Sequence, residues 1–249
     1  MGKGVSFIFR TALRLYLSNI SSVLGFGLLL VFVLFFLSMQ GVFISSGSIF
    51  FTYAVPAATY LESLVFGAVF LGFLFAYSVF TITVVFAVRS QLSHVKLHYY
   101  FSDKIRRFAV KYFVFLALFS LASFCLSVLL GFAGLKVLGF LLSAAVVFFL
   151  MFLPQAIVVD EESMSSSLQN ALEFSLKHKK TTFLVFLSSL LAVFVLLALE
   201  FALNLFLLPG EFLSLLLVSL FLVPFIEVVK TIYYLEKMGL VKNVSLKMQ

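Results

Sequence analysis

The sequence lacks tryptophan altogether and has a single cysteine among its 249 residues. Cys125 therefore cannot form an intrachain disulfide, and a zinc site made of cysteines is excluded. Without tryptophan, any aromatic belt at a membrane interface has to be built from tyrosine. Histidine occurs only three times, and each copy lies in or beside a basic stretch. Disulfide-stabilised folds and cysteine-based metal folds are thereby ruled out.

Charge is scarce as well: Asp, Glu, Lys and Arg make up 11% of the chain, whereas hydrophobic residues make up 63%. Soluble domains are about a quarter charged and about half apolar. A mean hydropathy of +1.22 fits an integral membrane protein, because helices satisfy their own backbone groups in lipid. The net charge of +7 then indicates anionic lipid headgroups as partners rather than nucleic acid.

Six apolar stretches have the length of about 20 residues that a helix needs to cross a bilayer. Lys3, Arg10 and Arg14 precede the first stretch, as they would in a signal peptide. That stretch is too long for the apolar core of a cleaved signal, so we expect an uncleaved span. We predict one integral membrane domain over 1–249, with spans at approximately 20–44, 63–88, 112–130, 138–159, 181–208 and 212–234.

The basic residues fall on alternate sides of these stretches. Sixteen of the seventeen Lys and Arg residues lie before the first span, after the second, after the fourth or toward the end of the chain. The positive-inside rule then places both termini in the cytoplasm. The sequence therefore predicts an all-α, multi-pass protein of the cell membrane, with three hairpins of spans that start and finish at the cytoplasmic side.

Two stretches have the apolar periodicity of amphipathic helices that lie in a membrane interface. We expect one at 3–18, before the first span, and one at about 162–178, before the fifth. A third copy at 103–111 would complete a repeated unit of interfacial helix, span, short turn and span. The segment 49–60 is apolar but too short to cross, and it fits either a re-entrant or interfacial segment or an extension of the second span.

The stretch FLPQAIVVD at Phe152–Asp160, followed by SLQNALEFS at Ser167–Ser175, resembles a known group. The group is an uncharacterised family of six-span prokaryotic, mainly archaeal, membrane proteins related to the membrane domain of glycerophosphodiester phosphodiesterases. The tail from Val223 to Tyr234 fits the same pattern. The resemblance implies a fold and a location. It implies no active-site residues, because the phosphodiesterase chemistry of that family belongs to a separate soluble barrel.

Two carboxylates lie within apolar spans, where ionisable residues are candidates for function. Glu200 has Asn204 one turn later on the same helical face, and the two side chains together suit a cation or a proton relay. Glu227 is followed by Lys230, which can neutralise it while reaching outward toward the headgroups. Because the two Glu residues are expected in opposite leaflets, we do not expect them to form one site.

Some residues point to the shape and packing of the spans. Pro154 and Pro224 are candidate kinks, because proline removes a helical hydrogen bond. Small residues such as Gly25 and Gly72 permit close helix packing, within the chain or in a homo-oligomer or membrane complex.

The loop after the second span is the most basic part of the chain. His94 and His98 have the spacing of a metal pair, but the surrounding cations favour an interpretation as headgroup-facing side chains, and we expect no metal and no cofactor. The candidate contacts to lipid headgroups are Arg89, Lys96, Lys104, Arg106, Arg107 and Lys111.

These observations favour a protein that is not an enzyme. Catalysis in a membrane needs a nucleophile, an acid–base pair or a metal at reachable depth, and the chain offers two separated carboxylates. We expect a membrane protein that binds lipid or another hydrophobic ligand, or that scaffolds a membrane complex. The alternative is a secondary transporter or channel subunit that uses Glu200 or Glu227.

Overall fold

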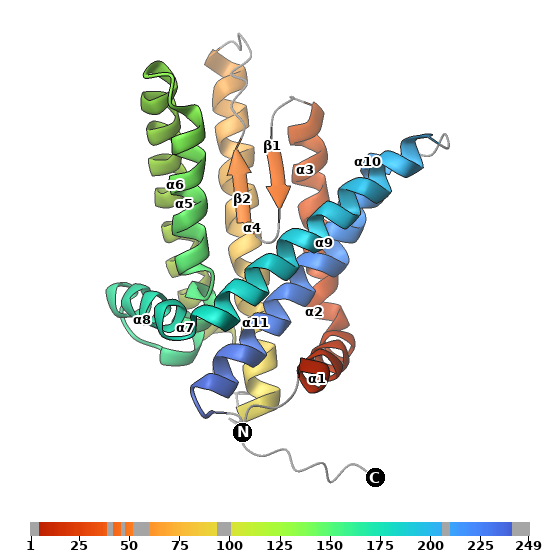
Figure 1. Cartoon of the computed structure of the whole chain (residues 1–249), viewed down its shortest axis with the longest axis vertical. Coiled ribbons are helices and arrows are strands. Elements are labelled where there is room, and N and C mark those ends of the chain that lie inside the picture. The colour runs from red at the N-terminus through yellow and green to blue at the C-terminus, as the bar shows by residue number, and fades with distance from the viewer. Residues whose placement is uncertain are drawn as a thin grey trace.

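The computed structural model describes residues 5–38, 42–45, 48–51, 60–93, 101–205 and 210–240. Within them, five helices are long and apolar enough to cross a membrane, and a bent pair at the N-terminus brings the number to six if it is one span. The expected helical, multi-pass membrane protein is confirmed at this level. Figure 1 shows the helices arranged as a loose bundle around α4.

The elements follow one another along the chain with few long connections in the described part. The helices that form the main part of the five spans are α4 (Tyr60–Ser93), α5 (Phe101–Phe132), α6 (Lys136–Leu150), α9 (Lys179–Leu205) and α11 (Val223–Lys237). Two spans extend beyond their main helix, one over Val137–Asp160 and the other over Leu213–Lys237. The shorter elements are α1 (Val5–Ser18), α2 (Ile20–Leu24), η1 (Gly25–Leu28), α3 (Leu29–Ser38), β1 (Val42–Ser45), β2 (Ser48–Phe51), α7 (Leu153–Asp160), α8 (Met164–Lys177), α10 (Gly210–Leu217) and η2 (Val218–Leu222).

The N-terminal helix α1 turns sharply into the first apolar stretch. The axis bends by 77° between 8–18 and 20–34. Asn19 stands at the bend, where its side-chain amide donates to the Leu15 carbonyl over 2.7 Å and its side-chain oxygen accepts from Gln91 Nε2 over 3.1 Å. These bonds fix the bend to the end of α4, so α1 runs across the bundle rather than along it (Figure 1).

The first apolar stretch is less regular than the predicted helix at 20–44. It consists of α2, the 3-10 turn η1 and α3, and α3 ends at Ser38. Residues Val42–Ser45 form β1, which pairs antiparallel with β2. The prediction of continuous helix to residue 44 is therefore wrong. For 49–60, the structure has strand up to Phe51 and helix from Tyr60, and 52–59 lie outside the described residues.

Helices α4 and α5 are each more than thirty residues long. The stretch 103–111, expected as a third interfacial helix, forms the first turns of α5 and continues into the span without a break. That prediction is wrong, because no helix-breaking residue separates the basic turns from the apolar ones and the helix propagates through both.

The predicted fourth span contains a break. Helix α6 ends at Leu150 and α7 begins at Leu153, and Pro154 lies in the first turn of α7. Proline is well tolerated there because the backbone N–H of that position has no helical partner in any case. Pro154 thus starts a helix at the place where a kink was expected.

Pro224 follows a π-helical turn, η2, which joins α10 to α11. In an α-helix the Leu220 carbonyl would accept from residue 224, and a proline there has no N–H. The Tyr16 hydroxyl donates to this carbonyl instead, over 2.7 Å. The irregular turn of the last span is therefore also the point where α1 is attached to α11.

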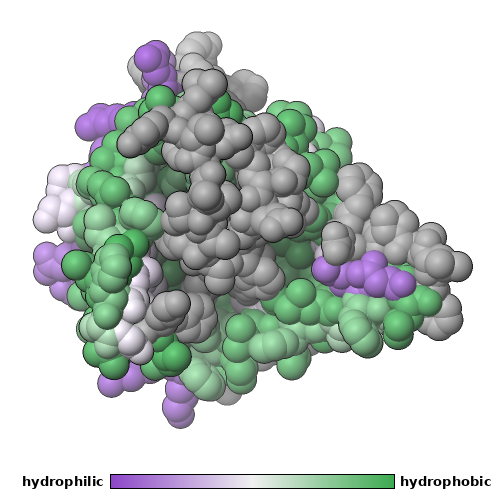
Figure 2. Space-filling model, turned by 90° about the horizontal axis from the view of Figure 1, so that it is seen from above, coloured by the Kyte–Doolittle hydropathy of each residue, from purple (hydrophilic) through white to green (hydrophobic). Residues whose placement is uncertain are grey.

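The buried core is concentrated at one end of the bundle, which we call the basic end and define by Arg10, Arg89, Arg106, Lys177 and Lys237. Helices α1 and α8 lie across the bundle near this end, on opposite sides (Figure 1). Half of the most apolar part of α4 is buried, and so is 56% of the most apolar part of the last span, Leu213–Lys237, whereas only 11% is buried in α5. Seen from the other end, which we call the far end, the described surface is mostly hydrophobic (Figure 2).

Candidate functional site

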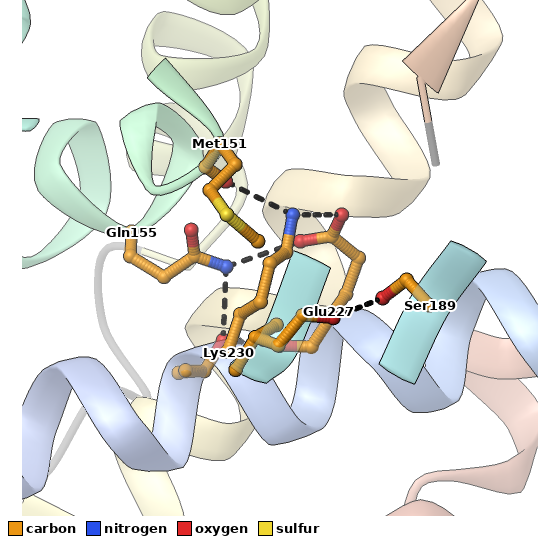
Figure 3. Close-up of polar contacts among 7 residues, drawn as sticks. Met151, Gln155, Ser189, Glu227 and Lys230 are labelled. Carbon is orange, nitrogen blue, oxygen red and sulfur yellow. Dashed lines mark hydrogen bonds and ion pairs between the residues drawn. The ribbon is translucent and has the colours of Figure 1, made fainter. Parts of the chain in front are cut away.

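A group of buried polar side chains joins α7 to α11 inside the core. Gln155, Glu227 and Thr231 are fully buried, and Lys230 is 5% exposed. Figure 3 shows Gln155 of α7 facing Glu227 and Lys230 of α11. We call these four residues the buried polar cluster. Its position within apolar surroundings makes every hydrogen bond in it costly to lose.

The Lys230 ammonium is the donor that balances the charge of the cluster. Its Nζ donates to Glu227 Oε1 over 2.6 Å and to the Met151 carbonyl over 3.1 Å. The side chain points inward, so the expectation that Lys230 reaches outward is wrong. The break between α6 and α7 supplies the reason, since the Met151 carbonyl lies in it and accepts a hydrogen bond from the ammonium.

Gln155 is the cluster residue that the sequence reasoning missed. Its Nε2 donates to Glu227 Oε2 over 3.0 Å and lies 3.4 Å from Thr231 Oγ1. Its Oε1 has no partner among the described residues. A carboxamide in an otherwise apolar run was the available signal, because a buried amide needs polar partners from another element.

The cluster acts chemically as a neutral unit. Thr231 donates to the Glu227 backbone carbonyl over 2.7 Å, so its hydroxyl is held by its own helix. Ser189 of α9 lies on the side away from Gln155 in Figure 3, and its hydroxyl donates to Val185 of the same helix over 2.8 Å. The positive charge of Lys230 thus matches the negative charge of Glu227, and the pair connects the last span to α7.

A second polar group lies where α7 ends. The Asp160 carboxylate accepts from Asn170 Nδ2 over 2.8 Å and from the Tyr234 hydroxyl over 3.1 Å. These bonds tie the end of α7 to α8 and α11. None of these three residues was singled out for a function from the sequence.

Glu161 continues the polar surface toward solvent. It accepts from Arg89 of α4 over 2.8 Å and from Lys104 of α5 over 2.7 Å. Arg89 also donates to the Val158 carbonyl. Burial favours the neutral acid, but the bonds to Lys104 and Arg89 outweigh it and hold the pKa of Glu161 below its ordinary value of 4.5. The backbone φ of Glu161 is 56°, a left-handed conformation that ends α7.

These contacts divide the candidate headgroup residues into two sets. Arg89 and Lys104 are bound to Glu161, and Lys111 donates to the Glu162 carbonyl over 2.6 Å. Arg106 and Arg107 are exposed. Lys96 lies outside the described residues. The acidic run at 160–162, which carries Asp160, Glu161 and Glu162, thus explains part of the positive charge that sequence reasoning assigned to lipid.

The other intramembrane carboxylate lies elsewhere. Glu200 of α9 accepts from the Ser214 hydroxyl of α10, and Ser214 is 4% exposed. Asn204, expected beside Glu200, is exposed. Glu200 pairs with Ser214, whereas Glu227 pairs with Lys230 and Gln155, so the structure brings together Glu227 and Lys230 but not the two carboxylates.

Within the described residues, no group of three or more His, Cys, Asp and Glu side chains is arranged to hold a metal ion. His94 and His98 lie outside them. Comparison with protein-family models, with curated proteins and with solved structures gives no match.

Proposed function

We propose that the protein is a non-enzymatic membrane protein that binds lipid along helix surfaces which its own fold leaves uncovered. The observation that supports this proposal is the uneven burial of the long helices. In α5 the buried side chains end at Ser120, and in α9 they end at Val193. Beyond these points toward the far end, the helices keep large apolar side chains on their surface.

The uncovered surfaces consist mostly of large apolar side chains, with Asn204 of α9 as an exposed polar residue among them. Leu129 of α5 is 66% exposed and Phe201 of α9 is 69% exposed. The other large apolar side chains exposed on these segments are Leu121, Val128 and Phe132 of α5 and Phe194, Val195, Leu197, Leu199 and Leu205 of α9. The neighbouring helix α6 adds Leu138, Leu141, Leu142 and Val146. Acyl chains are as apolar as these side chains, and they cover them without the cost of exposing apolar surface to water.

The orientation belongs to the same proposal. We place the basic end and both termini in the cytoplasm and the protein in the cell membrane, because Arg and Lys concentrate at that end. The resemblance to the membrane domain of glycerophosphodiester phosphodiesterases also stays a proposal, supported by the residues of Phe152–Asp160 and Ser167–Ser175.

Since the chain has no tryptophan, single substitutions give a site-specific test. We would compare Leu129→Trp and Phe201→Trp with the buried control Phe86→Trp, which is 0% exposed in the native side chain. In vesicles of brominated phospholipid, the fluorescence of the first two variants is expected to be quenched and that of the control to persist. If all three resist quenching, protein rather than lipid covers these surfaces, which would favour the scaffold of a homo-oligomer or membrane complex.

The competing proposal is a secondary transporter or channel subunit that uses Glu227 or Glu200. It is supported by the complete burial of Glu227 within a span. Lys230 weakens it, since the carboxylate already has a cation of its own. Proton and cation flux through reconstituted protein, compared with Glu227→Gln and Glu200→Gln, separates the two. If the native chain conducts protons or cations and either substitution abolishes this flux, transport would replace lipid binding as the proposed function.

A further inference from the structure

Three helix ends meet on one part of the basic end. Helix α8 ends at Lys177 and α9 begins at Lys179, with His178 between them. The His178 backbone N–H donates to Phe174 over 2.9 Å, and its carbonyl accepts from Thr182 over 3.0 Å. The turn is therefore a tight helical bend, and it places consecutive basic residues close together.

Helix α11 adds a further cation to this bend. The Phe174 ring lies between His178 and Tyr234, with centroid distances of 4.8 Å and 4.6 Å. Lys237 follows Tyr234 by three residues, on the same face of α11. Burial, together with the charges of Lys237 and Lys177, lowers the pKa of His178 below 6.5. We call Lys177, His178, Lys179, Lys180 and Lys237 the lysine cluster.

The four lysines of the lysine cluster outnumber the acidic residues beside them along the chain, Glu173 and Glu236. In the part of the chain that the structure describes, no carboxylate lies within ion-pair distance of any of its four lysines, and all four lysines are exposed. The nearest acidic residue along α8, Glu173, accepts from Gln169 over 2.9 Å. An excess of positive charge that the protein leaves unbalanced attracts an anion.

The surface next to the lysine cluster is apolar. Helix α9 carries exposed side chains at four-residue intervals, which places them on one face of the helix. This stripe starts three residues after Lys180 and runs away from the basic end: it consists of Phe183, Leu187, Leu191 and Val195. Cations followed by an apolar stripe match the order of phosphate and acyl chain in a phospholipid.

We propose that the lysine cluster binds the phosphate of an anionic phospholipid whose acyl chain lies along the α9 stripe. The assignment rests on the lipid binding proposed above and gives it a location and a headgroup class. A phosphomonoester carries a charge of about −1.5 to −2 at neutral pH. It is therefore expected to bind more tightly than a singly charged diester, and a zwitterionic headgroup should bind most weakly.

Native mass spectrometry of the full chain in detergent provides the test, by titration with phosphatidic acid, phosphatidylglycerol, phosphatidylcholine and inorganic phosphate. The triple variant Lys179→Gln, Lys180→Gln and Lys237→Gln is expected to weaken binding of phosphatidic acid at least tenfold. The matched control, Arg10→Gln with Arg106→Gln and Arg107→Gln, removes the same charge from exposed positions at the same end. It should change that affinity less than twofold.

Each outcome has a separate meaning. Equal losses in the two triple variants would show that general charge, not this site, attracts the lipid, and would overturn the proposal. Inorganic phosphate that binds as tightly as phosphatidic acid would also overturn it, in favour of a free-anion site. Equal affinity for phosphatidic acid and phosphatidylcholine would refute the anionic-headgroup site but not the proposed lipid binding. Absence of every lipid adduct would instead refute the proposed function.

Discussion

At the scale of single residues, the structure shows how an ion pair is accommodated in a core. Glu227 has no exposed surface, and its two carboxylate oxygens bind Lys230 and Gln155 respectively. Removing one charge of such a pair is far more costly than removing both, because the remaining charge is left without a partner in an apolar region.

This asymmetry gives the first prediction. Lys230→Met is expected to destabilise the folded protein by about 3–5 kcal/mol, whereas Glu227→Met combined with Lys230→Met should recover most of that loss. Unfolding in mixed detergent micelles, followed by far-ultraviolet circular dichroism, measures both. If Lys230→Met alone is as stable as the native chain, this result would contradict the contacts described for Lys230.

Glu161 gives a prediction about pH. Its pKa in the folded protein lies below the ordinary value because Lys104 and Arg89 hold the ionised form against the effect of burial. The contribution to stability is complete above the pKa of the unfolded chain and is lost as the pH falls through the lower folded value. The melting temperature of the native protein should therefore fall as the pH drops below about 4.5, and the melting temperature of Glu161→Gln should fall less. Parallel curves of melting temperature against pH for the two proteins would refute this prediction.

At the scale of elements, long continuous helices were easier to predict from the sequence than the breaks within helices. The hydrophobic stretches indicated helices at α4, α5 and α9, because length and composition alone decide whether a helix suits a membrane. The break at Met151 and the π turn before Pro224 depend on contacts from distant elements, namely Lys230 and Tyr16. A proline marks the neighbourhood of each irregularity, but the partner that accommodates it is not adjacent in sequence.

Close approach of α2 and η1 to α4 yields a prediction at this scale. A Cβ at Gly25 would overlap the ring of Phe80, whereas a Cβ at Gly67 meets nothing within 4 Å. Gly25→Ala should therefore destabilise the protein by about 1–3 kcal/mol. Gly67→Ala, in the interior of α4, should be neutral or stabilising by up to about 1 kcal/mol. Thermal unfolding of the two variants side by side compares them, and equal stability would contradict this packing.

The same glycines bear on association between chains. Gly25 and Gly72 face Phe80 and Phe32 of the same chain, so the close packing expected from them is used internally. Their presence therefore gives no separate support to a homo-oligomer. Sequence reasoning could not distinguish these cases, because a small residue looks the same whether its neighbour belongs to its own chain or to another.

At the scale of the whole molecule, the two ends of the bundle are built differently. The basic end holds the buried core, the buried polar cluster and the crossing helices α1 and α8. Toward the far end, α5 and α9 have apolar surfaces that the described part of the chain leaves exposed. The candidate site was only partly predictable: Glu227 and Lys230 stood out as charges in an apolar span, but Gln155 gained significance only from the approach of α7 to α11.

The proposed function requires above all that the bundle crosses the cell membrane with its basic end in the cytoplasm. Two single-cysteine variants in a Cys125→Ser background test it directly: Ser165→Cys on α8, and Leu135→Cys at the turn between α5 and α6, where both native side chains are exposed. A thiol reagent that cannot cross membranes, applied to intact cells, is expected to label residue 135 and to reach residue 165 only after permeabilisation. Labelling of residue 165 in intact cells, with residue 135 protected, would contradict the account.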